Sequence, residues 1–112
     1  MLAEARSRIA RYTPAEALEA DVLLVDLRSV DERERSGTIP GAVHVPRSVL
    51  EWRADPTSEW HDPALAGRRV VLVCGQGYSS SLAAASLVQL GVDAGDLEGG
   101  FDAWAAAGLP VE

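Results

Sequence analysis

The stretch VVLVCGQGYSSSLAAASL, residues 70–87, combines three local patterns that together indicate one architecture. Its apolar residues, ending at Val73, are typical of a strand covered on both faces. A glycine-broken polar loop follows over residues 74–79, and the alanine-rich run after it predicts a helix over residues 80–91. Three apolar side chains at helical spacing are expected to form the buried face of this helix: Ala83, Leu87 and Leu90.

Helices and strands alternate on both sides of this stretch. Further helices are predicted over residues 13–20, 30–35, 47–55 and 99–110, further strands over residues 21–29, 39–46 and 92–98, and a surface connection over residues 56–69. Such alternation indicates an α/β fold with a mostly parallel sheet between two helical layers. Because no repeat or linker divides the chain, we expect one domain over residues 1–112.

Two of the predicted helices begin with a complete capping signal. Thr13 and Glu16 stand three residues apart, as do Ser29 and Glu32. At this spacing, the side chain of each member of a pair accepts a hydrogen bond from the backbone N–H of the other member. Gly37 is expected to end the second of these helices. In parallel sheets of this kind, ligands bind at the loops that leave the carboxyl ends of the strands.

Composition excludes several classes of partner. The net charge of −7 argues against binding to nucleic acid, which needs clustered cations. No apolar run is long enough to span a bilayer, no secretory signal is present, and the single cysteine has no partner in the chain, so we expect a reduced, cytoplasmic protein. All ten basic residues are arginine, which indicates a GC-rich, bacterial source.

The cysteine is placed for reactivity. Cys74 lies where a strand ends and a helix begins, and Gly75 and Gly77 allow successive backbone N–H groups to point at one centre. With the positive end of the helix, such a cradle stabilises a thiolate, a persulfide or a bound oxyanion. The alternative is an inert buried thiol. We favour the reactive interpretation because strand, loop and helix occur together in this order.

Three segments of the chain, in this order, resemble a single-domain rhodanese of the thiosulfate sulfurtransferase type. CGQGYSSSLAAASL, residues 74–87, is similar to the family pattern C-x-x-G-x-R-S with its alanine-rich helix. LLVDLRSVDERERSGTIPGAVHVP, residues 23–46, is similar to the family's strand ending in Asp-x-Arg, acidic helix and Gly-x-Ile-Pro-Gly-Ala segment. LEGGFDAWAAAGLPV, residues 97–111, is similar to its closing Gly-Gly-x-x-Ala-Trp segment.

The resemblance implies a five-stranded parallel sheet and a sulfurtransferase that works through a cysteine persulfide without a metal or other cofactor. Carried over, Cys74 is the nucleophile, and the sulfur is held by the loop residues Gly75, Gln76, Gly77, Tyr78, Ser79 and Ser80. The donor would be thiosulfate or another persulfide. The acceptor would be cyanide in a test tube, or a thiol such as thioredoxin or glutathione.

The chain departs from the family pattern at Ser79, where an arginine is usual. The loop therefore carries no cation, and we expect weak binding of doubly charged thiosulfate. Positive charge would come from the end of the helix, or from Arg28 or Arg47 if the fold brings either close.

Other distinctive residues are assigned structural roles. Asp26 and Arg28 at a strand end are interpreted as an ion pair that supports the loop. Both histidines lack a second ligand at metal spacing, the DERER run is interpreted as a solvated helix face, and Phe101 and Trp104 as core anchors. The sequence does not decide whether Trp52 and Trp60 are surface residues or line the mouth of the site.

Two alternative functions remain. Related folds use a cysteine loop in phosphatases and arsenate reductases, but phosphoryl transfer needs an arginine that neither Ser79 nor Ser80 replaces. A non-catalytic module that binds a partner or senses sulfur is the other alternative, and the presence of Cys74 counts against it.

Overall fold

The apolar run at residues 70–73 forms β4 (Val70–Val73), a strand in which every residue is buried. In this computed structural model, which describes residues 1–112, β4 lies in the middle of a five-stranded sheet of order β1-β5-β4-β2-β3. All four strand pairings are parallel. The other strands are β1 (Ala10–Tyr12), β2 (Leu23–Asp26), β3 (Val43–His44) and β5 (Ala94–Leu97). The α/β fold and the five-stranded sheet are confirmed.

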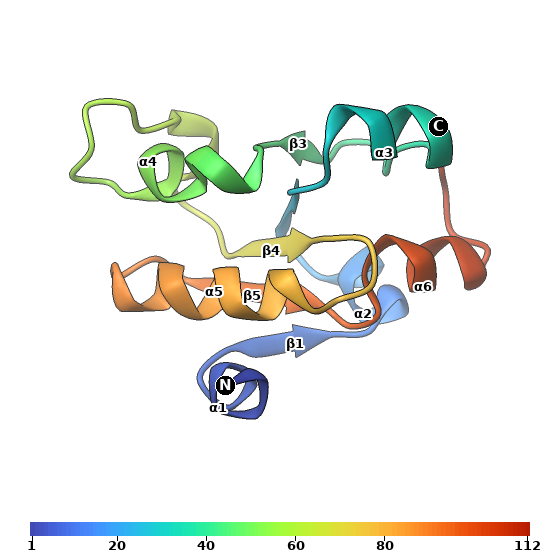
Figure 1. Cartoon of the computed structure of the whole chain (residues 1–112), viewed down its shortest axis with the longest axis horizontal. Helices are drawn as coiled ribbons and strands as arrows, with labels where there is room; N and C mark the ends of the chain where they lie inside the picture. Colours follow the sequence, from blue (N-terminus) through green and yellow to red (C-terminus); the bar gives the residue numbers. More distant parts are fainter.

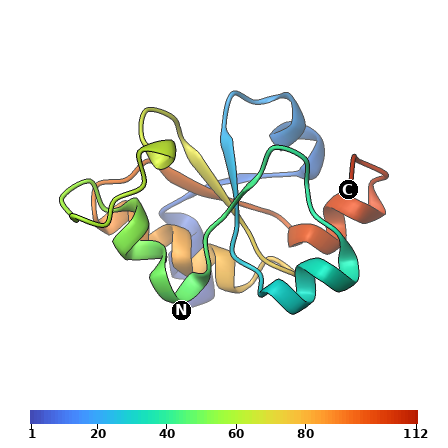
Figure 2. The same cartoon turned by 90° about the horizontal axis from the view of Figure 1, so that it is seen from above.

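Alternate residues of β4 point into two separate cores. Val70 and Leu72 pack with α4 (Leu50–Ala54) and α5 (Ser79–Gln89), while Val71 and Val73 pack with α2 and α6. These two helices span Pro14–Glu19 and Gly100–Ala106. Figure 2 shows α4 and α5 on one side of the strands and α2 on the other. A strand buried on both faces explains the unbroken apolar run.

Two elements at the start of the chain were not predicted from the residues. They are α1 (Leu2–Ser7), which packs on α5, and the edge strand β1, which pairs with β5. The three residues of β1 are only partly buried and one of them is Arg11, so β1 has no apolar pattern. Its conformation depends on β5, a partner some 85 positions away.

The predicted buried face of α5 is wrong at one position. Ala83 and Leu87 are fully buried, but Leu90 is 41% exposed. Leu90 follows the last helical residue, and the chain turns away at Gly91, which has φ of +84°. The face is completed instead by three small residues: Ser80, Ser81 and Ala84.

The other predicted helices and strands are present, but their first or last residues differ from the prediction. Both capping boxes are present, and Gly37 caps α3 (Val30–Ser36) with φ of +90°. Residues 47–55 form a 3₁₀ turn, Arg47–Val49, followed by the short α4, and the surface connection contains a second 3₁₀ turn, Pro63–Leu65. No helix has the length and apolar character needed to cross a membrane.

Two helices meet the sheet at the end where ligands are expected. Figure 1 shows α3 and α6 beyond the tips of the arrows of β1 and β4, which are the carboxyl ends of the strands. The loop between β4 and α5 lies at the same end, between these helices and the sheet.

Candidate functional site

The cysteine loop is held against the start of α6 by backbone hydrogen bonds. The N–H of Phe101 donates to the carbonyl of Cys74 at 2.7 Å, and the N–H of Asp102 donates to the carbonyl of Gly75 at 3.0 Å. These are amides of the first helical turn, which have no partner within the helix. The start of α6 therefore fixes the direction in which the loop leaves β4.

Two glycines make this close approach feasible. Gly77 has φ of +87°, and a Cβ there would lie 2.7 Å from the backbone nitrogen of Gly99. Gly100 has φ of +63°, and a Cβ there would lie 2.8 Å from the carbonyl carbon of Gly75. Loop and helix start thus touch backbone to backbone, which explains why glycines occur in both segments.

The sulfur of Cys74 lies inside the loop and receives several hydrogen-bonding groups. The N–H of Gly77 donates to Sγ at 3.0 Å, and Oγ of Ser80 lies 3.4 Å from Sγ. Burial raises the pKa of the thiol, but hydrogen bonds from the hydroxyls of Ser80 and Ser79 and from the amides of Ser80 and Gly77 outweigh it. The net result is a pKa of Cys74 below its ordinary value, which favours the nucleophilic thiolate.

A cavity of about 360 Å³ opens over this loop. Four of the predicted loop residues line it together with Cys74: Gly75, Gln76, Tyr78 and Ser79. The other two, Gly77 and Ser80, are buried beneath it. Residues 74–80 thus line the cavity or lie beneath it, whereas the supporting residues Asp26 and Arg28 do not line it.

Two carboxylates complete the wall of the cavity, and no cationic side chain lines it. Glu32 on α3 uses Oε1 in its capping box with Ser29, while its Oε2 lies 3.5 Å from the position that a Cβ on Gly75 would occupy. Asp102 lies in the first turn of α6. The DERER run is therefore not a purely solvated face, because Glu32 borders the site.

The two arginines considered as sources of positive charge do not line the cavity. Arg28 is buried, forms an ion pair with Asp26 at 2.9 Å and lies 3.9 Å above the ring of Phe101. Arg47, in the 3₁₀ turn before α4, pairs with the partly buried Glu51 on α4. The expected ion pair of Asp26 and Arg28 is present, and it secures the end of β2.

The remaining aromatic and histidine residues lie as follows. Phe101 and Trp104 are buried in the core between the sheet and α6, as expected. Nε2 of His44 lies 2.8 Å from the carbonyl oxygen of Arg28. Trp52 and Trp60 are both more than half exposed and do not line the cavity.

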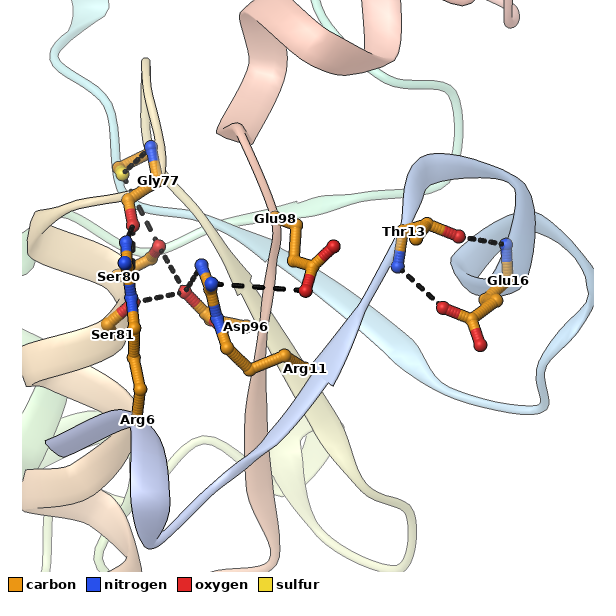
Figure 3. A network of polar contacts seen from close by, with 10 residues as sticks. Arg6, Arg11, Thr13, Glu16, Gly77, Ser80, Ser81, Asp96 and Glu98 are labelled. Atoms are coloured by element: carbon orange, nitrogen blue, oxygen red, sulfur yellow. Dashed lines mark hydrogen bonds and ion pairs between the residues drawn. The ribbon is translucent and has the colours of Figure 1, made fainter. Parts of the chain in front are cut away.

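Three residues that sequence reasoning missed surround the loop from behind, as Figure 3 shows. Arg6 donates to the carbonyl of Gly77 at 3.0 Å and to Oγ of Ser81 at 3.1 Å. Arg11 donates to the fully buried carboxylate of Asp96 at 2.8 Å. The signal for this network was Asp96 itself, because a carboxylate within a buried strand requires partners.

The family of this chain follows from its similarity to known proteins. Residues 12–107 match the model of the rhodanese-like domain. The chain belongs to the rhodanese-like family. This rhodanese-like chain is also 37% identical over 92 residues to a sulfurtransferase of Allochromatium vinosum, a match that covers 81% of this chain and 78% of that protein.

Two solved structures are similar to this chain along nearly its whole length. A Rhodopseudomonas palustris protein of unknown function, described as a possible tyrosine phosphatase, is 38% identical with a TM-score of 0.92, over 99% of this chain and 90% of that one. A thiosulfate sulfurtransferase of Pseudomonas aeruginosa is 29% identical with a TM-score of 0.73, over 93% of this rhodanese-like chain and 19% of that larger protein. The chain is thus a homologue of rhodanese-type sulfurtransferases.

Proposed function

We propose that this chain is a sulfurtransferase that carries sulfane sulfur as a persulfide on Cys74. The observation that supports the proposal most directly is the thiol itself. Its Sγ receives an amide hydrogen bond at 3.0 Å, its pKa lies below the ordinary value, and a cavity opens above it. A thiol held in this way is a nucleophile with room for one further sulfur atom.

The reaction has two balanced steps. The Cys74 thiolate attacks the outer sulfur of a donor R–S–S⁻, a bond forms between the two sulfurs, and R–S⁻ leaves with the electron pair of the broken bond. With thiosulfate the leaving group is sulfite. An acceptor nucleophile then attacks the outer sulfur of the persulfide, and the thiolate is regenerated. The loop amides stabilise negative charge on the transferred sulfur throughout.

The charges around the cavity favour a donor with less negative charge than thiosulfate. Glu32 and Asp102 border the entrance, and Ser79 stands where the family pattern has arginine. A dianion approaching two carboxylates is repelled by both, and no side-chain cation offsets the repulsion at the cavity wall. The preferred donor is therefore a thiol persulfide, either small or on a protein, and thiosulfate is a poor substitute.

The acceptor in the cell is a thiol, such as reduced thioredoxin or glutathione, and cyanide serves in the test tube. Both can approach from the open side of the cavity, above Gln76 and the exposed Tyr78. Release of the first product before the acceptor binds predicts ping-pong kinetics.

A phosphatase is a weaker candidate, even though one similar structure is described as a possible tyrosine phosphatase. Phosphoryl transfer needs bidentate contacts to the equatorial oxygens, and Ser79 and Ser80 present single hydroxyls instead. The acidic entrance also opposes a phosphate dianion. We expect no hydrolysis of a phenyl phosphate above background, and hydrolysis that depends on Cys74 would overturn this view.

The deciding experiment measures intact mass under non-reducing conditions after incubation with thiosulfate or with cysteine persulfide, which carries one negative charge fewer. We expect a species one sulfur atom heavier, formed faster with the persulfide, lost on addition of cyanide and absent in Cys74→Ser. If neither donor changes the mass while Cys74 remains open to alkylation, the protein is not a sulfur carrier. Partner binding that survives in Cys74→Ser would then identify a binding module.

A further inference from the structure

Beneath the cysteine loop lies a carboxylate that the sulfur transfer described above does not use. Asp96, in the middle of β5, is completely buried. Its Oδ2 accepts hydrogen bonds from Oγ of Ser80 at 3.0 Å and from Oγ of Ser81 at 2.6 Å. Its Oδ1 accepts from Nε of Arg11 at 2.8 Å (Figure 3). Burial of a carboxylate is costly unless its charge and lone pairs are matched, so this network has to stay complete.

Ser80 links this carboxylate to the reactive sulfur. Its Oγ lies 3.4 Å from Sγ of Cys74 and 3.0 Å from Oδ2 of Asp96, but a hydroxyl has only one hydrogen to donate. While Cys74 is a thiol, S–H donates to Ser80 and Ser80 donates to Asp96. Once the thiol proton has left to solvent, the hydroxyl of Ser80 turns to donate to the thiolate.

Turning the hydroxyl removes one donor from Asp96. Its Oδ2 then keeps the hydroxyl of Ser81 and Nη2 of Arg11, which lies 3.3 Å away. Without Arg11, a buried carboxylate would share Ser80 with a thiolate of like charge. A carboxylate and a thiolate that are bonded to the same hydroxyl repel each other, and this repulsion raises the pKa of the thiol. The arginine is thus the only full positive charge bonded to Asp96.

The other charged side chains around Cys74 pair with opposite charges, contact the loop without touching Sγ, or face the cavity. Arg6 on α1 reaches the loop through the carbonyl of Gly77, through Ser81 and through the ring of Tyr78, whose centroid lies 6.0 Å from the guanidinium carbon, and it has no direct contact with Sγ. Glu98, which follows β5, lies 3.9 Å from Arg11, and Asp26 and Arg28 on the β2 side pair with each other. The carboxylates of Glu32 on α3 and Asp102 on α6 face the cavity and oppose the thiolate.

We propose that Arg11 is a positioning residue that neutralises Asp96, so that Ser80 is free to hold Cys74 as a thiolate. Hydrogen bonding to Asp96 raises the pKa of Arg11 above its ordinary value, against the effect of burial, and attraction to Asp96, Glu98 and Cys74 adds to this, so Arg11 stays charged. The arginine missing at position 79 is thereby replaced from behind the loop, without placing a cation in the cavity.

The inference rests on the proposed function, because it concerns the same thiolate, but its test needs no sulfur donor or acceptor. The rate of alkylation of Cys74 by iodoacetamide is measured against pH in Arg11→Gln, Asp96→Asn and the double variant. Arg69→Gln is the matched control, because Arg69 also pairs with an aspartate, Asp93. Arg69 directly precedes β4 and Asp93 directly precedes β5, so this pair lies at the end of the sheet opposite to Cys74.

We expect Arg11→Gln to raise the pKa of Cys74 by about one, so that alkylation at neutral pH slows roughly tenfold. Asp96→Asn lowers the pKa of Cys74. The double variant returns it close to the wild-type value, because the charge and its counter-charge are both gone. Arg11→Lys, which keeps the charge, stays near the wild type, and Arg69→Gln leaves the profile unchanged.

An unchanged profile in Arg11→Gln, or a double variant that keeps the raised pKa, overturns the proposal. If Arg11→Gln fails to fold, Asp96→Asn decides alone, since the proposal requires a lower thiol pKa there and a purely structural aspartate does not. If no persulfide forms but the variants shift the pKa of Cys74 as expected, the proposed function is refuted and this inference stands.

Discussion

Replacing Gly100 by alanine is predicted to detach the cysteine loop from the start of α6. Gly100 has φ of +63°, so an alanine there bears about 1 kcal/mol of left-handed backbone strain. Its Cβ would also lie 2.8 Å from the carbonyl carbon of Gly75 and closer still to the carbonyl oxygen of Cys74. Both are backbone atoms, so relief requires the loop to move, which adds about 1–3 kcal/mol.

Gly108, at the other end of α6, provides the control. It has φ of +75°, but a Cβ there meets nothing within 4 Å. Gly108→Ala therefore carries only the strain, about 1 kcal/mol, whereas Gly100→Ala is expected to cost about 2–4 kcal/mol. Urea unfolding followed by tryptophan fluorescence measures both.

The same variant has a chemical consequence. Moving the loop lengthens the hydrogen bonds that Phe101 and Asp102 donate to the carbonyls of Cys74 and Gly75, at 2.7 and 3.0 Å in this structure. The cradle around Sγ then opens, so the pKa of Cys74 rises and alkylation at neutral pH slows. Equal destabilisation by the two alanines, or unchanged reactivity of Cys74 in Gly100→Ala, would refute the close backbone contact as the reason for glycine.

Three further predictions concern charge and hydrogen bonding at the site. Glu32→Gln with Asp102→Asn raises kcat/KM for thiosulfate about three- to tenfold at low salt and little at high salt, whereas Asp31→Asn, an exposed acid outside the cavity, has no such effect. Ser80→Ala raises the pKa of Cys74. Ser86 is also on α5 but donates to Glu51, so Ser86→Ala leaves the alkylation profile unchanged. Asp26→Asn costs about 3–5 kcal/mol at neutral pH because it leaves Arg28 buried without its partner. The pKa of Asp26 is lowered: burial raises it, but hydrogen bonds and charge from Arg28 and Arg33 prevail. Its stabilisation is thus present above the ordinary aspartate value and lost as pH falls, so the gap in urea stability between wild type and Asp26→Asn narrows below about pH 4.

Local patterns were sufficient for the elements that carry strong signals. Both capping boxes, the buried strand β4 and the glycine loop form as expected, because their determinants lie within a few residues of one another. The edge strand β1 and the exposure of Leu90 were missed. Both depend on where the neighbouring chain runs rather than on local periodicity.

The sequence by itself determined the chemistry at the front of the site: Cys74, the glycines that bring amides to it, and the absence of an arginine at position 79. Only the tertiary structure decided the charges around it. Glu32 and Asp102 reach the cavity from two different helices, and Arg11 and Asp96 meet beneath the loop from paired strands far apart in the chain. The physical reason is range, since the conformation of the glycine loop follows from nearby residues, whereas the pKa of a buried thiol depends on every charge that folding places around it.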